Sequence, residues 1–316
     1  MEEARIKHIL FDLDGTLLPM VQEEFVRFYM PLLAKAYIEA GVQVGTGAFI
    51  AAVWKGYGAM VANDGSCTNC EAFWRSMDGV LPVSREESER IALGFYADAF
   101  NQAACTASPS PFAAEAVRAA KDRGIAVYLA TNPVFPRCAT MNRIRWAGLC
   151  AEDFRIITTY EDCSFCKPNT AYFQGILDQF GLDPRECLMV GNDVEEDLAI
   201  RALGVRTFLV TDTVENRHGR QIVTGAMENC QGQQIETDAM ENRQGQQIET
   251  DAIENRQGQQ IETDAIENCQ GRQIVEGAME NRQGQQSSCH DQAAVTDYMG
   301  SLEELVAFIK GLPADR

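Results

Sequence analysis

The chain has 316 residues, 46% of them hydrophobic, which is enough for one large domain or two smaller domains with a substantial core. Its formal net charge is −19. Such an acidic chain is repelled by phosphate backbones and by anionic lipid, so we expect no nucleic-acid partner and no membrane partner.

The numbers of cysteine and histidine residues limit which cell compartment and which reaction chemistry we expect. The sequence shows no secretory signal pattern and no apolar run long enough to cross a bilayer, so we expect a cytoplasmic protein. The eleven cysteines are odd in number and scattered, which favours reduced thiols. Two Cys-x-x-Cys pairs, Cys67/Cys70 and Cys163/Cys166, lie too far apart for a zinc ribbon. With only three histidines, we do not expect histidine to carry the chemistry.

The first apolar run, residues 6–10, predicts a buried strand of a parallel sheet. Because side chains alternate along a strand, Asp12 and Asp14 point to the same side at its carboxyl end, and Gly15 permits a sharp turn. Open α/β sheets bind their ligands at this edge. Two carboxylates this close need a cation, and their oxygens suit Mg²⁺.

The next span, residues 19–107, predicts a bundle of helices, because its apolar residues recur at helical spacing. Pro31 predicts a kink or a restart in the first helix. The expected helices cover residues 21–40, 48–61, 69–77 and 85–102. Some aromatic residues of this span are candidates to line a substrate pocket, although such residues more often pack in a core. They are Trp54, Tyr57, Phe73 and Trp74.

Residues 108–212 predict the rest of the sheet. An apolar run at 125–130 predicts a buried strand, which Thr131-Asn132-Pro133 brings to an end. A hydroxyl at this place, with backbone N–H groups beside it, can hold a phosphoryl oxygen. Further strands are expected at 154–160, 187–190 and 205–210, and helices at 112–123, 137–147 and 169–180.

Charged residues follow two of these elements. Lys167 stands on a loop before a helix, and lysine is a compact point charge on a long stem. The strand 187–190 ends in an acidic loop that contains Asn192, Asp193 and Asp197. Acidic residues at a helix N-terminus complement its dipole, which is reason enough for the two glutamates of this loop but not for Asp193.

In their order along the chain, these four segments resemble the motifs of the haloacid dehalogenase (HAD) superfamily, most of whose members are Mg²⁺-dependent phosphohydrolases. The resemblance covers residues 6–197. It implies a Rossmann-like parallel α/β core and hydrolysis of a small phosphate monoester, so that the expected partner is a small phosphorylated metabolite. It also implies that residues 19–107 form a helical C1 cap, which would close over the site and select the substrate.

The resemblance further implies a role for individual residues. Asp12 would attack phosphorus and form an aspartyl-phosphate, and Asp14 would protonate the leaving oxygen and then activate water. Lys167 and Mg²⁺ would offset the charge on the transferring group. Thr131, with Asn132 beside it, would fix a phosphoryl oxygen.

The implied metal ligands are Asp12, Asp14, Asn192, Asp193 and Asp197. Many relatives carry Asp directly after the glycine of the fourth motif, where this chain has Asn192. We expect Asp193 to be the direct ligand, because a carboxylate binds a hard cation better than an amide does, and Asn192 to be a second ligand or a neighbour of the site. Asp197 would orient either Lys167 or a water of the metal.

Three other functions are compatible with the same sequence. A phosphomutase shares every motif. A dehalogenase shares the fold, although it does not need Mg²⁺ and usually lacks the second acid that Asp14 supplies. The alternative from a different class is a non-catalytic HAD-like scaffold that displays a repeated segment to a protein partner.

That repeated segment covers residues 213–291, where Glu-Asn recurs every 13 residues. We predict an insertion in a surface loop, since extra loop length costs little. Its apolar residues are few, which favours disorder over stacked β turns or helix. The near-identity of the copies favours a neutral expansion over partner binding. The predicted core therefore comprises residues 1–18, 108–212 and 292–316, and it ends in a helix at 301–309.

Overall fold

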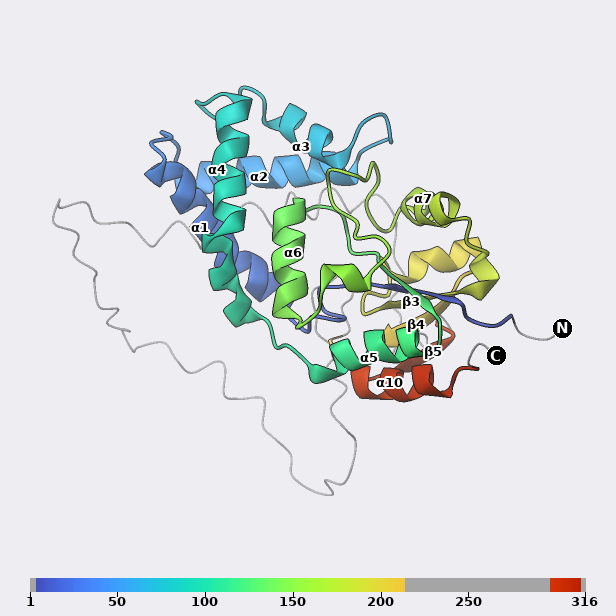
Figure 1. Cartoon of the computed structure of the whole chain (residues 1–316). Helices are drawn as coiled ribbons and strands as arrows, with labels where there is room; N and C mark the ends of the chain where they lie inside the picture. Colours follow the sequence, from blue (N-terminus) through green and yellow to red (C-terminus); the bar gives the residue numbers. More distant parts are fainter. Residues whose placement is uncertain (1–3, 214–295, 314–316) are drawn as a thin grey trace, which may run out of the picture.

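The computed structural model of the chain describes residues 4–213 and 296–313 (Figure 1). The repeat predicted for residues 213–291 lies outside these ranges, apart from its first residue. None of the helices that the structure describes is long and apolar enough to cross a membrane.

The centre of the fold is a five-stranded parallel sheet in the order β2-β1-β3-β4-β5, which confirms the predicted Rossmann-like α/β class. β1 lies between β2 and β3, so that Phe11 at its end is level with Leu129 and Val190. The strands are β1 (His8–Phe11), β2 (Ala126–Leu129), β3 (Cys187–Gly191), β4 (Arg206–Val210) and β5 (Tyr298–Gly300).

Consecutive side chains of each strand point to opposite faces of the sheet, and both sets are apolar. Helices therefore cover both faces. Ile9 and Phe11 of β1 belong to the hydrophobic cluster that includes α5 (Pro111–Asp122) and α10 (Leu302–Gly311), which pack on each other. Leu10 belongs to the cluster of the opposite face, with α7 (Thr170–Phe180). The short 3₁₀ helix η4 (Leu198–Leu203) packs beside α7.

A second group of helices lies away from the sheet, between β1 and α5, in blue and cyan in Figure 1. We call residues 22–106 the helical insertion. Its α1 continues through Pro31 without a restart, and the predicted helix 85–102 is wrong at its end, since Asp98 leaves helical geometry. The elements are α1 (Gln22–Glu39), α2 (Thr46–Val61), α3 (Asn69–Met77), α4 (Arg85–Ala97) and the 3₁₀ helix η1 (Ala99–Thr106).

One predicted strand is wrong, and one strand was missed. The segment 154–160 forms only an isolated bridge, Ile157 to Leu129, although its backbone bonds to β2 at Arg155, Ile156 and Thr158. The strand β5 was not predicted, since three residues are too few to show an alternating pattern. The predicted helix 137–147 is confirmed as α6 (Arg137–Trp146).

One buried side chain ties the helical insertion to the loops of the core. The backbone N–H of Asn69 donates to the oxygen of Cys163 at 2.7 Å, and its side-chain amide donates to the oxygen of Pro133 at 3.1 Å. The same amide reaches the oxygen of Phe165 and the sulfur of Cys166, both at 3.3 Å. These bonds hold the insertion on the two loops that carry Asn132 and Lys167.

Both Cys-x-x-Cys pairs lie near this contact. All cysteines that the structure describes are free thiols, as predicted. Within the described residues, no three histidine, cysteine or acidic side chains converge as a metal site.

Candidate active site

The site is built at the carboxyl edge of the sheet, where β1 and β3 end side by side. Asp12 directly follows β1, and its N–H donates to the oxygen of Val190 at 2.9 Å. Its carboxylate is buried and accepts a hydrogen bond from Thr16, 3.1 Å away, which also donates to Asn192 at 2.9 Å. Gly15 has a φ of +80°, and a Cβ there would collide with the Asn192 amide, so glycine is required.

Lys167 brings two carboxylates together. Its ammonium nitrogen lies 2.7 Å from Asp12 Oδ1 and 2.6 Å from Asp197 Oδ1, and its side chain is 1% exposed. Burial alone would lower the pKa of Lys167, but the charges of Asp12 and Asp197 raise it well above its usual value. The lysine is therefore a fixed cation in the centre of the site.

The acidic loop after β3 holds the other side of that lysine. Asp197 Oδ2 accepts the N–H of Asp193 at 3.0 Å, so both oxygens of Asp197 are already engaged. Asp193 Oδ1 accepts the N–H groups of Glu195 and Glu196, both at 2.7 Å. The glycine that ends β3, Gly191, has no room for a Cβ because the Asp197 carboxylate occupies that space. The carboxylates of Asp193 and Asp197 thus fix the backbone of this loop.

The loop after β2 completes the edge. Asn132 accepts the backbone N–H of Lys167 at 3.3 Å and donates to Glu196 at 2.9 Å, which links this loop to the two others. Burial, followed by the charge of Asp193, raises the pKa of Glu196 to about 8. The backbone carbonyl oxygen of Thr131 accepts hydrogen bonds from the hydroxyl groups of Thr158 at 2.7 Å and Tyr172 at 2.9 Å. Seven of the eight residues predicted for the site therefore follow the ends of three adjacent strands, and Lys167 reaches them from the loop before α7.

Sequence reasoning missed one charged group, Arg143 of α6. Its side chain is fully buried and forms an ion pair with Asp14 Oδ2. The guanidinium carbon lies 4.1 Å from the centroid of the Phe135 ring, a cation–π contact. No sequence motif predicts a role for this residue, because a single arginine in a predicted helix is usually exposed to solvent.

The ion pair with Arg143 engages only one of the two carboxylate oxygens of Asp14. Its other oxygen, Oδ1, is buried and has no hydrogen-bond partner among the described residues. Burial raises the pKa of Asp14 to about 6, and Arg143 opposes that rise. An orphaned buried oxygen is costly unless a ligand or a proton satisfies it.

The oxygen donors at this edge suit a hard divalent cation. The carboxylates of Asp12 and Asp193, the amide oxygen of Asn192 and the orphaned oxygen of Asp14 are all of the kind that Mg²⁺ prefers. Asp14 pairs with Arg143, and no three acidic, histidine or cysteine side chains of the described ranges converge as they stand. The donor set therefore fits Mg²⁺ in its chemistry, while the side chains must turn toward it.

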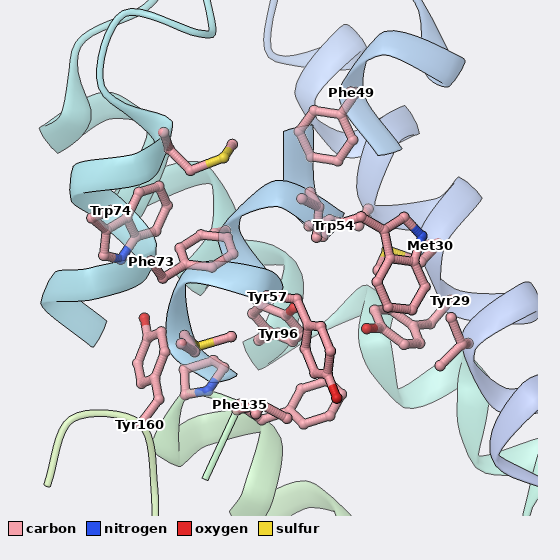
Figure 2. A pocket seen from close by; sticks show the side chains of 18 of the residues that line it. Tyr29, Met30, Phe49, Trp54, Tyr57, Phe73, Trp74, Tyr96, Phe135 and Tyr160 are labelled. Atoms are coloured by element: carbon pink, nitrogen blue, oxygen red, sulfur yellow. The ribbon is translucent and has the colours of Figure 1, made fainter. Parts of the chain in front are cut away.

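A cavity of about 170 Å³ lies between the helical insertion and the loop after β2 (Figure 2). Val134, Phe135 and Pro136 contribute its wall on the core side. The four aromatic residues named from the sequence all line it, and they are Trp54, Tyr57, Phe73 and Trp74. Trp74 is also buried in the hydrophobic core, so for this residue both interpretations hold.

The family assignment rests on a match over most of the chain. The model of the haloacid dehalogenase-like hydrolases matches residues 6–204. The chain belongs to this family. No curated protein sequence matches the chain closely enough to count as a relative.

Several solved structures of this family are similar to the chain. YfnB from Bacillus subtilis, a HAD hydrolase bound to magnesium, is 17% identical with a TM-score of 0.46, over 67% of this chain and 92% of that one. The HAD phosphatase from Thermococcus onnurineus is 17% identical with a TM-score of 0.41, over 65% and 86%. The L-2-haloacid dehalogenase from Xanthobacter autotrophicus is 17% identical with a TM-score of 0.40, over 66% and 79%. Such low values say nothing about the substrate of this HAD-like chain.

Proposed function

We propose that this chain is a Mg²⁺-dependent phosphohydrolase that cleaves a small phosphate monoester through an aspartyl-phosphate on Asp12. The observation that carries the proposal is the buried Lys167 ammonium, 2.7 Å from Asp12 and 2.6 Å from Asp197. A fixed cation beside a buried carboxylate at a strand edge suits the transfer of an anionic group to that carboxylate. The helical insertion, 22–106, would then serve as the C1 cap.

The reaction divides into two displacements at phosphorus. In the first, a carboxylate oxygen of Asp12 forms a bond to phosphorus, and the ester oxygen leaves with its bonding electrons and takes a proton from Asp14. In the second, water attacks the same phosphorus and gives its proton to Asp14, which frees Asp12 and inorganic phosphate. Asp14 Oδ1, the oxygen that Arg143 does not hold, is the atom that suits this proton.

The other residues of the site hold the reacting groups. Asp12 and Asp193, with Asn192 beside them, would hold Mg²⁺, which offsets phosphoryl charge when it is bound. Asp14 would reach the metal through its backbone oxygen, because Oδ1 carries the proton and Oδ2 pairs with Arg143. Asp197 keeps Lys167 in place, because both of its oxygens are engaged in the loop. Thr131 and Asn132 would bind a phosphoryl oxygen from the β2 side.

A dehalogenase of the same fold is the second candidate, and the ion pair of Arg143 with Asp14 favours it. A halide leaves without a proton, so a carboxylate held by arginine does not hinder that reaction. Release of halide from a haloalkanoic acid by the metal-free protein would favour this candidate. In the described part of the chain, nothing favours the phosphomutase or the scaffold over these two.

The test is to trap the phosphorylated enzyme. The protein is mixed with a phosphate monoester and Mg²⁺, quenched in acid, and digested for mass spectrometry. We expect one phosphoryl group on the peptide that contains Asp12, and none in the Asp12→Asn variant, which lacks the nucleophile. Asp122→Asn, at the exposed end of α5, is the matched control and should label like the wild type. A label that persists in Asp12→Asn, or turnover without any label, would contradict the proposal.

A further inference from the structure

The cavity between the helical insertion and the core is lined by uncharged and mostly apolar side chains. Its lining consists of aliphatic and aromatic side chains, one glutamine and several tyrosines, and none of these described residues carries a charge at neutral pH. Tyr37, one of the tyrosines, already donates its hydroxyl to Ser88. Figure 2 shows the aromatic side chains gathered around the space, among them Tyr29, Trp54, Tyr57, Phe73, Trp74 and Phe135.

This cavity adjoins the catalytic edge of the sheet. Phe135 lines the cavity, and its ring also contacts the guanidinium of Arg143, which in turn holds Asp14. Tyr57 lies on the same side, because it packs in one hydrophobic cluster with Cys166, the residue before Lys167. The cavity therefore lies next to two segments that carry the catalytic edge, those of Arg143 and Lys167.

The walls of the cavity hold flat rings. Trp54 and Tyr57 pack edge to face, with centroids 5.5 Å apart and planes at 84°. Phe73 and Trp74 do the same, at 5.1 Å and 87°. A Cβ at Gly56 would collide with the Phe73 ring, so this ring packs directly against the backbone of α2. The space is thus shaped before any ligand binds.

Size and charge limit what the cavity accepts. Its volume of about 170 Å³ is close to that of an engineered apolar cavity, about 150 Å³, that stays dry and binds benzene. A second phosphate or a carboxylate in it would find no cation among the described lining residues, and an unpaired buried charge is costly. Most of the lining surface is carbon, which favours a ring over a sugar with several hydroxyls.

We infer that the substrate is a phosphate monoester whose organic group is uncharged and apolar, of about one aromatic ring, and that this group occupies the cavity lined by Trp54, Tyr57, Phe73 and Phe135. The inference rests on the proposed phosphohydrolase function. It narrows the substrate class from phosphorylated metabolites in general to esters of apolar, ring-bearing alcohols, and it excludes bisphosphates.

The test compares esters with similar leaving groups, so that only the cavity distinguishes them. We expect kcat/KM in Mg²⁺ for phenethyl phosphate to exceed that for ethyl phosphate by about 10- to 100-fold, as burial of one ring predicts. A carboxylate on the ring should remove this gain, and glucose phosphate should be no better than ethyl phosphate. Calorimetry with phenethylphosphonate and ethylphosphonate, which are not hydrolysed, should show the same preference in binding.

A pair of variants places the effect in the cavity. Val53 lines the cavity, and Val53→Trp, which fills it, should lower the ratio of phenethyl to ethyl kcat/KM about tenfold or more. Val80→Trp, an exposed position of the same insertion, is the matched control and should leave the ratio unchanged. The wild-type substrate series decides the question even if the cavity variant does not fold.

The outcomes separate the two claims. Hydrolysis of ethyl phosphate without any gain for phenethyl phosphate, or with a preference for glucose phosphate, would overturn the substrate class and leave the phosphohydrolase intact. If no ester is hydrolysed, the phosphohydrolase is overturned, and the calorimetry then decides the cavity alone: equal binding of the two phosphonates would overturn it as well.

Discussion

Replacing Lys167 by methionine is expected to lower kcat about 10²- to 10³-fold on any substrate of the enzyme. The ammonium group lies 2.7 Å from Asp12 and 2.6 Å from Asp197, and its charge is the fixed positive group of the site. Without it, charge that develops on the phosphoryl group loses its stabilisation, and the two buried carboxylates repel each other. Phosphate release at saturating substrate measures the effect.

The matched control is Lys310→Met. Lys310 also forms an ion pair at 2.6 Å, with Glu115, but its side chain is 56% exposed and lies on α10. This variant should keep the kcat of the wild type. Circular dichroism of both variants shows whether they remain folded. A folded Lys167→Met protein with wild-type kcat would contradict the role given to this lysine.

Replacing Arg143 by methionine is expected to lower the free energy of unfolding by about 3–5 kcal/mol. Arg143 is fully buried, and its loss leaves the largely buried Asp14 carboxylate without its ion-pair partner. The contact with the Phe135 ring is lost as well. Urea unfolding followed by fluorescence measures the change.

Two further variants test whether the unpaired charge of Asp14 causes the loss of stability in Arg143→Met. Arg137→Met removes an ion pair on the same helix, but both Arg137 and Asp162 are about half exposed, so we expect a change within about 1 kcal/mol. Combining Arg143→Met with Asp14→Asn removes the unpaired charge and should recover part of the lost stability. Equal losses in Arg143→Met and Arg137→Met, or a strictly additive double variant, would contradict this explanation.

The sheet and the site at its edge were predictable because they depend on local patterns. β1, β2 and β3 are short apolar runs that end in polar residues, and in a parallel sheet their carboxyl ends meet at one edge. The residues that follow, Asp12, Thr131 and Asp193, were therefore expected together, and the structure brings them together. Lys167 lies on a loop, and its place was expected only from the family resemblance.

The contacts that could not be predicted from the sequence join segments that lie far apart in the chain. Arg143 meets Asp14 across 129 positions, and the Asn69 amide reaches Pro133 across 64. Neither has a periodic pattern or a motif, since a lone arginine in a helix and a lone asparagine before a cysteine are common. The segment 154–160 is a different case, because its backbone bonds to β2 over too few residues to form a regular strand.

The most direct measurement is phosphate release from phosphate monoesters by the wild type and by Asp12→Asn, each with Mg²⁺ and with EDTA. We expect turnover by the wild type in Mg²⁺ alone, and none by the variant in either condition, because Asp12 supplies both the nucleophile and a metal ligand. Turnover that survives the substitution, or a folded wild type inactive on every ester, would contradict the assignment of this chain as a phosphohydrolase.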